Sequence, residues 1–317
     1  MVDAGAAFVA SAIEHHLGAR PEHVTKLASG YGEEVFEAVL RNRSVLFKAD
    51  REAGKGRVVL EAWAYQRARE LGAPAPRVLA TDLGRENYPR NFIIIEKVPG
   101  VPLSRVERGT DERRRLVREA GWAIRAVHEI GIPGFGILEE STYLRNAQVQ
   151  GEYDTWEAYI SIVMESAIAA LRSSGAIDDA GVDRINRVLA GHVDFYELGP
   201  VGHLLHGSFD PAHVLVDDAR VAGIVDFGER RSGDPAWDVG GFLMENIAET
   251  RDLLDGYDPD KRRAEAFEVT IPLYGGLRAI LAARRANDES RPLDRDRLLA
   301  VADSSFAALG HRGSSPL

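Results

Sequence analysis

The chain has 317 residues, with 39 basic and 49 acidic side chains and a formal net charge of -10, and a chain of this length predicts two domains or lobes. The absence of cysteine excludes disulfide bonds, a thiolate nucleophile and any cysteine-ligated zinc or iron–sulfur site. The acidic balance disfavours nucleic acid as a partner, and no apolar run approaches the roughly 20 residues that a membrane-spanning helix needs.

The N-terminal third of the chain predicts a small sheet with one strong helix. The first residues lack the basic segment of a signal peptide, so we expect a cytoplasmic protein without a membrane partner. Hydrophobic spacing predicts helices over 5–17 and 58–71, the second ended by Gly72, and strands near 24–27, 35–40, 44–48, 78–81 and 92–97.

The rest of the chain is predominantly helical, with one short β-rich segment. Helical periodicity covers 111–130, 155–174, 177–197 and most of 235–309, and the β-rich segment covers 204–227. Strands gathered at one end and helices at the other predict an α+β fold of two lobes.

Residues 206–242 carry the most chemistry. A loop beginning at His206-Gly207 leads into a short apolar strand, a turn at Asp217-Asp218, and a return strand that ends at Asp226. Such a hairpin would bring positions 208, 213 and 226 together at its open end. A phosphoryl-transfer site needs a cluster of this kind, with one group to orient the attacking hydroxyl and two ligands for Mg²⁺.

This pattern resembles the aminoglycoside phosphotransferase family, which are small-molecule kinases with a protein-kinase-like fold. The family's motif is H-G-D-x-x-x-x-N, then I-D-F/W and G-D-P-x-x-D. It is matched by His206-Gly207, Val225-Asp226-Phe227, and Gly233-Asp234-Pro235 with Asp238. The resemblance implies a β-rich nucleotide-binding lobe over 1–98 and a helical lobe over 99–317 with the catalytic loop and the acceptor site.

The resemblance also implies a site for ATP or GTP with Mg²⁺. Lys48 would touch the α- and β-phosphates, with Glu61 as its helix partner, and Gly30 and Gly32 would mark a loop over the phosphates. Glu96 and Val98 would flank the hinge whose backbone pairs with the nucleobase, and His213 and Asp226 would hold the metal.

Two positions depart from the family pattern. Ser208 stands where the family has the aspartate that accepts or orients the substrate hydroxyl proton, and a neutral hydroxyl is no useful base near pH 7. His213 replaces the family's asparagine. Neutral imidazole can bind a divalent metal, although Mg²⁺ prefers oxygen, and related kinases of macrolide type also carry histidine there.

Three interpretations of Ser208 stay open at this point. The catalytic base is lost, by nature or by engineering, which leaves a nucleotide-binding protein with little turnover. Alternatively Asp210, two residues along the loop, replaces it, or the acceptor hydroxyl is activated by position alone. His206 opens this loop and belongs to the same candidate catalytic group. We expect structural roles for Asp234, Asp238 and His128.

The acceptor is predicted to be a small molecule. Residues 226–260 hold ten acidic and three basic side chains, a local excess of seven negative charges that would suit a cationic antibiotic of the aminoglycoside or a related type. A solvated helix face explains the same charges equally well. Among the three basic residues, Arg230 and Arg231 directly follow the metal loop and could touch phosphate.

The function predicted is O-phosphotransfer to a hydroxyl; the alternatives are a pseudokinase-like binding protein and a metabolic kinase for a choline-like or fructosamine-like acceptor.

Overall fold

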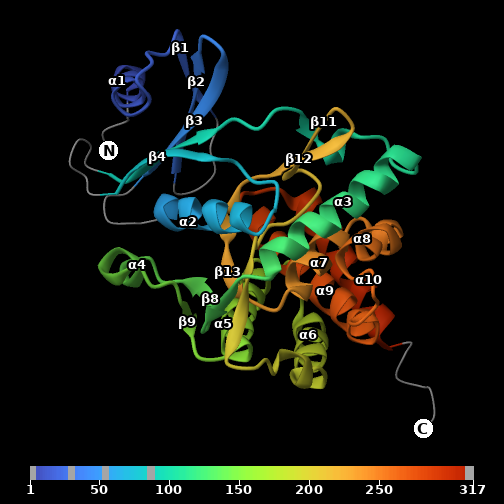
Figure 1. Ribbon diagram of the computed structural model, residues 1–317. Helices are drawn as coiled ribbons and strands as arrows, with labels where there is room; N and C mark the ends of the chain where they lie inside the picture. Colours follow the sequence, from blue (N-terminus) through green and yellow to red (C-terminus); the bar gives the residue numbers. More distant parts are fainter. Residues whose placement is uncertain (1–4, 28–32, 52–56, 84–89, 311–317) are drawn as a thin grey trace.

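The computed structural model describes residues 5–27, 33–51, 57–83 and 90–310, and it has two lobes (Figure 1). The N-terminal lobe is an antiparallel five-stranded sheet in the order β1-β2-β3-β5-β4. Its elements are α1 (Ala6–Leu17), β1 (His23–Leu27), β2 (Glu33–Leu40), β3 (Arg43–Asp50), α2 (Arg57–Glu70), β4 (Val78–Asp82) and β5 (Phe92–Glu96).

The sheet is covered by a helix on each face, as the alternation of its side chains requires. On β5, Phe92 and Ile94 join the core beneath α1, whereas Ile93 and Ile95 join the larger core that contains α2. Lys48 of β3 is paired with Ile93 and therefore lies on the α2 side of the sheet. The predicted α+β fold with a β-rich N-terminal lobe is confirmed.

The C-terminal lobe is mainly helical, with two small sheets in the strand orders β7-β10-β13-β8-β9 and β12-β11-β6. Its longer helices are α3 (Asp111–His128), α5 (Trp156–Ser173), α6 (Asp179–Gly191), α7 (Ala236–Leu243), α8 (Thr250–Tyr257), α9 (Ala264–Asp288) and α10 (Pro292–Gly310). The remaining elements are α4 (Glu140–Asn146), β6 (Val101–Pro102), β7 (Gly131–Pro133), β8 (Phe135–Leu138), β9 (Gly151–Tyr153), β10 (Val201–Leu205), β11 (Val214–Asp217), β12 (Arg220–Ile224) and β13 (Arg231–Gly233), with short 3₁₀ turns η1 (Leu103–Arg105), η2 (Val193–Tyr196), η3 (Phe227–Glu229) and η4 (Ile247–Glu249).

The structure adds elements that hydrophobic periodicity does not reveal. The strands β7, β8 and β9 and the short helix α4 fill residues 131–153, and the stretch predicted as one helix over 177–197 divides into α6 and η2. Strands of three or four residues with glycine or proline in them are too short for a period of two to stand out.

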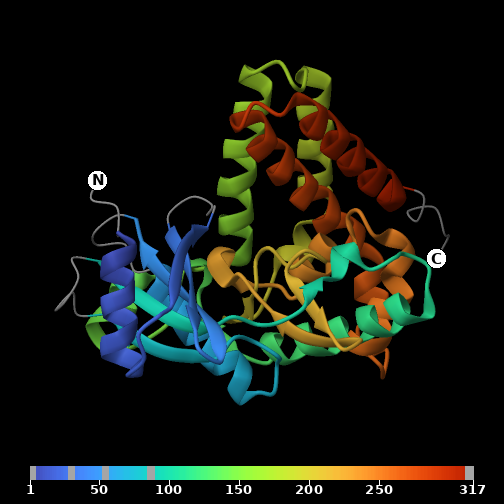
Figure 2. The ribbon, with the colours of Figure 1, turned by 90° about the horizontal axis from the view of Figure 1, so that it is seen from above.

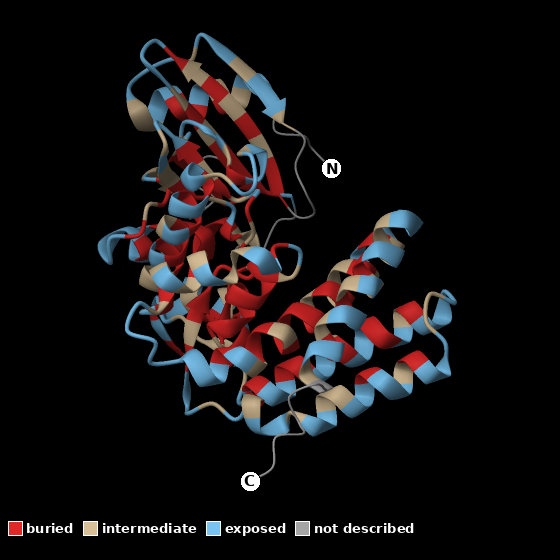
Figure 3. Ribbon diagram, turned by 90° about the vertical axis from the view of Figure 1, so that its right-hand side faces the viewer, coloured by how far each residue is buried: buried red, intermediate tan, exposed pale blue. Residues whose placement is uncertain are grey.

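The helices α5 and α6 stand beside α9 and α10 on one side of the C-terminal lobe (Figure 2). In this group, buried residues face inward and exposed residues face outward (Figure 3). α9 is long and apolar enough to cross a membrane, but 61% of its apolar window is buried, because it packs against α5, α7 and α10. Burial of this kind is typical of the core helix of a soluble protein.

Candidate functional site

A buried ion pair joins the N-terminal sheet to α2. The Nζ atom of Lys48 lies 2.6 Å from both carboxylate oxygens of Glu61 and 2.9 Å from Oε2 of Glu33. Burial alone would lower the pKa of Lys48, but the two carboxylates outweigh burial and raise the pKa well above its ordinary value. The structure therefore brings a permanently charged ammonium group to the predicted phosphate site.

The Tyr65 hydroxyl connects this ion pair to the predicted metal loop. It donates to Oε1 of Glu61 at 2.7 Å and accepts from the backbone N–H of Asp226 at 3.1 Å. Tyr65 and Glu61 are one turn apart on α2, and Phe227 packs against the Tyr65 ring with a centroid distance of 5.3 Å. The position of α2 and the position of Asp226 are thus coupled through one side chain.

The loop that begins at His206, predicted to be the catalytic loop and called so below, is held by Asp238 of α7. Its carboxylate accepts the backbone N–H groups of His206 at 2.6 Å and Gly207 at 2.9 Å, and it also contacts Nε2 of His128 at 3.1 Å. Burial opposes ionisation, but the hydrogen bond from His128 and nearby cations lower the pKa of Asp238. The structural roles expected of Asp238 and His128 agree with these contacts.

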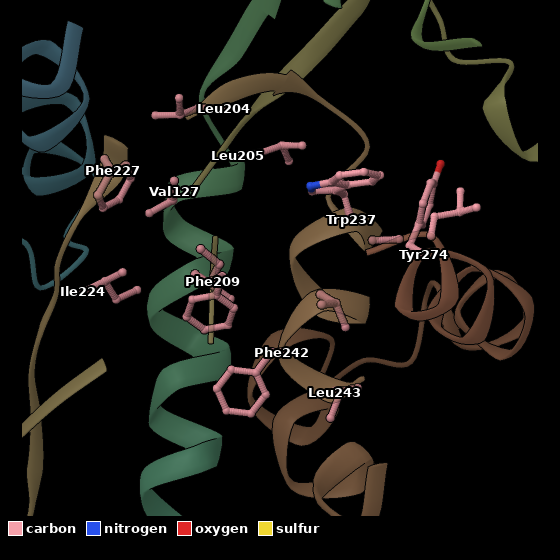
Figure 4. Packing of buried hydrophobic residues seen from close by; sticks show 14 of the residues in the cluster. Val127, Leu204, Leu205, Phe209, Ile224, Phe227, Trp237, Phe242, Leu243 and Tyr274 are labelled. Atoms are coloured by element: carbon pink, nitrogen blue, oxygen red, sulfur yellow. The ribbon is translucent and has the colours of Figure 1, made fainter. Parts of the chain in front are cut away.

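Two further contacts fix the loop. The Nε2 atom of His206 donates to the carbonyl of Val225 at 2.8 Å, which leaves Nδ1 as the acceptor side of a neutral ring. Burial lowers the pKa of His206 to about 4, so the ring is neutral at pH 7. Phe209 is buried and stacks on Phe242 at a centroid distance of 5.0 Å, beside α3 (Figure 4).

The open end of the β11–β12 hairpin brings His213 and Asp226 together, as the sequence predicts. The Nε2 atom of His213 lies 3.7 Å from Oδ2 of Asp226, and its Nδ1 lies 2.8 Å from the carbonyl of Ser208. Burial alone would lower the pKa of His213, but Asp210 and Asp226 raise it to about 9. Asp226 has a left-handed φ of 66°, a strained conformation for a residue with a side chain, of the kind found at functional sites.

Ser208 and Asp210 differ in what surrounds them. The Ser208 hydroxyl lies 3.4 Å from Nδ1 of His206. Asp210 is turned into its own loop, where Oδ1 accepts the backbone N–H groups of Ala212 at 2.6 Å and His213 at 3.3 Å, and Oδ2 lies 3.3 Å from His213 Nδ1. Both of its oxygens are therefore engaged within the loop.

The remaining predicted nucleotide residues are placed only in part. Gly30 and Gly32 lie outside the described residues. Glu96 ends β5, and the side chain of Val98 lies against Gly223 of β12, where an added Cβ would approach it to 3.0 Å. Across the described stretches no group of three or more His, Asp or Glu side chains could hold a metal, so His213 and Asp226 form a two-ligand candidate site.

Sequence reasoning missed three residues of the site. Glu33 is the second carboxylate on Lys48, Tyr65 bridges to Asp226, and Arg278 of α9 donates to the carbonyl of Gly207. The one-turn spacing from Glu61 could have indicated Tyr65. Nothing near Arg278 in the sequence points to a loop 71 residues earlier.

Only part of the acidic segment, Asp226, Glu229 and Asp238, lies at the predicted catalytic loop. Asp234 caps the start of α7 and contacts Tyr274, and three more carboxylates pair with arginines of α3 and α10. These pairs are Glu245 with Arg297, Glu249 with Arg113, and Asp252 with Arg118. Glu245, Glu249 and Asp252 therefore belong to paired helix faces and not to an acidic acceptor site.

The two arginines that follow the predicted metal loop are held by protein groups. Arg230 donates to the carbonyl of Phe227 and lies 3.6 Å from Glu140, while Arg231 contacts Tyr159 and Glu229.

Three comparisons with known proteins bear on this site. The chain is 25% identical over 186 residues to hygromycin-B 4-O-kinase from Escherichia coli, a match that spans 58% of this chain and about half, 51%, of that relative. In three dimensions it resembles a thermostable mutant of aminoglycoside phosphotransferase APH(4)-Ia in ternary complex with ADP and hygromycin B, with a TM-score of 0.69, 18% identity and coverage of 99% and 100% of the two chains.

A second solved structure, the streptomycin–ATP–APH(2")-IIa ternary complex, has a TM-score of 0.62 at 16% identity and covers 96% of this chain and 99% of its own. At such identities these structures show the two-lobed kinase-like fold. Residues 23–279 match the profile of the phosphotransferase enzyme family, which is most of the chain. The chain therefore belongs to the phosphotransferase enzyme family, as the aminoglycoside-phosphotransferase motif predicts.

Proposed function

We propose that the chain is an ATP- or GTP-dependent O-phosphotransferase that acts on a hydroxyl group of a small molecule. The observation that carries the proposal is the link from the Lys48–Glu61 ion pair through the Tyr65 hydroxyl to Asp226. A buried cation suited to nucleotide phosphates is thereby coupled to a carboxylate suited to a divalent metal. Family membership supports the same class of reaction.

The donor set at the end of the hairpin fits a magnesium ion. Mg²⁺ is commonly bound by one or two protein groups, and its other ligands are water and phosphate. Asp226 would hold it, and its side chain is 58% exposed. His213, whose Nε2 lies 3.7 Å from Asp226, would join as a ligand only with loss of a ring proton, because its pKa of about 9 leaves the imidazole protonated at pH 7. When bound, the ion would neutralise charge on the transferring phosphate.

In the transfer, the acceptor oxygen bonds to the γ-phosphorus as the bond to the bridging oxygen breaks and ADP or GDP leaves, and the hydroxyl proton passes to an oxygen of the transferred phosphoryl group. Lys48 would bind the nucleotide phosphates, and Ser208 would face the acceptor hydroxyl. Both carboxylate oxygens of Asp210 are engaged in the loop, which favours activation of the hydroxyl by position over a surrogate base. The transition state is largely dissociative, so positioning supplies much of the catalysis.

The nucleotide-binding lobe in this proposal is 1–98 and the catalytic and acceptor lobe is 99–317. The backbone between Glu96 and Val98 would meet the nucleobase, Gly30 and Gly32 would cover the phosphates, and His206 would shape the catalytic loop. We place the enzyme in the cytoplasm. Hygromycin B is the first acceptor to test, with a role in antibiotic resistance, because the curated relative is named for it.

A second candidate is a pseudokinase-like nucleotide- or ligand-binding protein. The absence of a carboxylate at position 208 and the engagement of Asp210 favour it. The third candidate is a metabolic kinase of choline-like or fructosamine-like acceptors, which would use the same residues for nucleotide and metal.

Replacement of Ser208 separates the first two candidates. A catalytic base contributes about 10²–10⁴-fold, so we expect Ser208→Asp to raise kcat for phosphate transfer by about 100-fold, with little change in the KM for nucleotide. Ser208→Asn is the matched control, because asparagine has the shape of aspartate without its charge. ADP release is measured over a panel of antibiotics, choline and fructosamines, alongside calorimetric titration of Mg·ATP and Mg·GTP. Tight nucleotide binding without transfer by either protein would contradict the enzyme assignment.

A further inference from the structure

Glu229, three residues after Asp226, is surrounded by four arginines from three elements. Its Oε2 lies 3.0 Å from Arg231 of β13, and its Oε1 lies 3.9 Å from Arg57 of α2 and 3.5 Å from Arg285 of α9. Arg278, also on α9, is a fourth cation close enough to help lower the pKa of Glu229, which burial alone would raise. We call these four residues the arginine cluster.

The arginine cluster sets four guanidinium groups against the carboxylates of Glu229 and Asp238. Asp238 attracts Arg231 and Arg278, and it is also bound to two backbone N–H groups and His128. Arg231 and Arg278 both lie over the Trp237 ring, at 5.7 Å and 5.2 Å from its centroid. Repulsion between these two cations and, above all, burial lower the pKa of Arg278 to about 10.

Two members of the arginine cluster keep donors for a ligand. Arg57 and Arg285 are each beyond hydrogen-bond distance from the shared Oε1 atom, and their side chains are 34% and 61% exposed. Arg57 also donates to the carbonyl of Gly228 at 3.2 Å. Guanidinium groups present paired donors that match the two oxygens of a carboxylate or a phosphate.

The arginine cluster borders the catalytic loop on the side of α5 and α9. Arg278 donates to the carbonyl of Gly207, the residue before Ser208, and Arg231 donates to the Tyr159 hydroxyl of α5. The carbonyl of Glu229 lies so close to Gly207 that a Cβ there could not fit. In the proposed function the nucleotide binds at Lys48, and the arginine cluster is attached through Arg278 to the loop that carries Ser208, where the acceptor would bind.

We infer that the acceptor of this phosphotransferase is a hydroxylated small molecule that carries an anionic group, a carboxylate or a phosphate, and that Arg285 and Arg57 bind this group. The inference rests on the proposed function, because the bound anion is an acceptor only if the protein transfers phosphate to it. The arginine cluster would repel a polycationic acceptor, whereas a bound anion would reduce the repulsion among its arginines.

The test uses acceptor pairs that differ in one charged group: D-glycerate and glycerol, D-gluconate and D-glucitol, glucose 6-phosphate and glucose, with hygromycin B as the polycation. Binding to the full chain is measured by calorimetry with Mg·AMP-PNP, and transfer by ADP release. We expect at least one anion to bind about tenfold more tightly than its neutral partner, because hydrogen bonds from a guanidinium to an anion are stronger than those to a neutral group.

Arg285→Gln should remove this preference and raise the KM for the anionic acceptor about tenfold, with the KM for nucleotide unchanged. Arg284→Gln is the matched control, since Arg284 is the preceding residue of α9 and pairs with Asp288 at 3.1 Å. Equal binding of charged and neutral partners, a preference for hygromycin B, or a rise in the KM for nucleotide in Arg285→Gln would overturn the inference. The calorimetric arm decides it even without transfer: anion binding that depends on Arg285 with no ADP release supports the anion site and refutes the proposed function.

Discussion

His206 is a titratable residue whose charge state is set by its position in the fold. Its ring is buried between Phe227 and His213, donates to the carbonyl of Val225 and has a pKa lowered to about 4 by burial. An unfolded chain binds a proton at this residue near pH 6.5, and the folded chain does so only near pH 4. The stability that His206 contributes is therefore present above pH 6.5 and lost as the pH falls toward 4.

This difference predicts a pH dependence of stability. Between pH 7 and 4.5, the free energy of unfolding of the wild type should fall by about 2–3 kcal/mol more than that of His206→Gln, which has no proton to bind there. Urea titrations at a series of pH values measure both slopes. His15→Gln, at an exposed position of α1, is the control for losing an imidazole. Parallel slopes in the wild type and His206→Gln would show that this ring does not link protons to folding.

At the scale of elements, α3 and α8 pack backbone against backbone. A Cβ added at Gly121 of α3 would lie 2.2 Å from the carbonyl oxygen of Leu253, and one added at Gly256 of α8 would lie 1.9 Å from that of Arg118. Glycine on both helices is what permits this approach. The packing matters for the site because α3 also supplies His128, which contacts Asp238 beneath the catalytic loop.

Gly121→Ala should therefore destabilise the chain by about 1–3 kcal/mol, since the helices must separate to admit a methyl group. Gly191→Ala provides the comparison, because it also adds a methyl group to a helix and meets nothing within 4 Å. It should raise stability by up to about 1 kcal/mol through helix propensity. Chemical denaturation of the two variants measures both effects, and equal effects of the two substitutions would refute the close packing of α3 and α8.

At the scale of the whole molecule, the two lobes share one hydrophobic core. The larger core contains Leu60 and Tyr65 of α2 and Ile93 of β5 together with Leu116 of α3 and Trp237 of α7. Among the residues that the structure describes, the face of the sheet beneath α1 forms a separate, smaller core. A shared core predicts that the lobes unfold in one transition, although the chain is longer than most two-state proteins.

Hydrogen exchange followed by mass spectrometry across a urea series tests this cooperativity. We expect peptides from β5 and from α3 to lose protection at the same urea concentration. Peptides from α1, which lies over the smaller core, should lose protection at that concentration or below it. Loss of protection in β5 at a clearly lower concentration than in α3 would mean that the N-terminal lobe unfolds by itself.

The sequence predicts the fold and the neighbours of the site well where short-range pattern controls them. The family resemblance pairs Lys48 with Glu61, and these side chains are in contact; the hairpin between Val214 and Ile224 brings His213 to Asp226. The contacts of Glu33, Tyr65 and Arg278 were not predicted, because each depends on how elements pack and not on a local period. The sequence left two readings of the acidic segment open for the same reason, since the arginines that pair with Glu245 and Glu249 are distant in sequence.

The anchoring of the catalytic loop by Asp238 has a consequence for how this fold can change. Its carboxylate accepts hydrogen bonds from backbone N–H groups and not from the side chain at position 208, so these two hydrogen bonds do not depend on which residue stands there. We expect substitutions at position 208 to alter the chemistry of the loop while Asp238 still holds its backbone. Directed evolution at this position would therefore explore changes of chemistry on one scaffold.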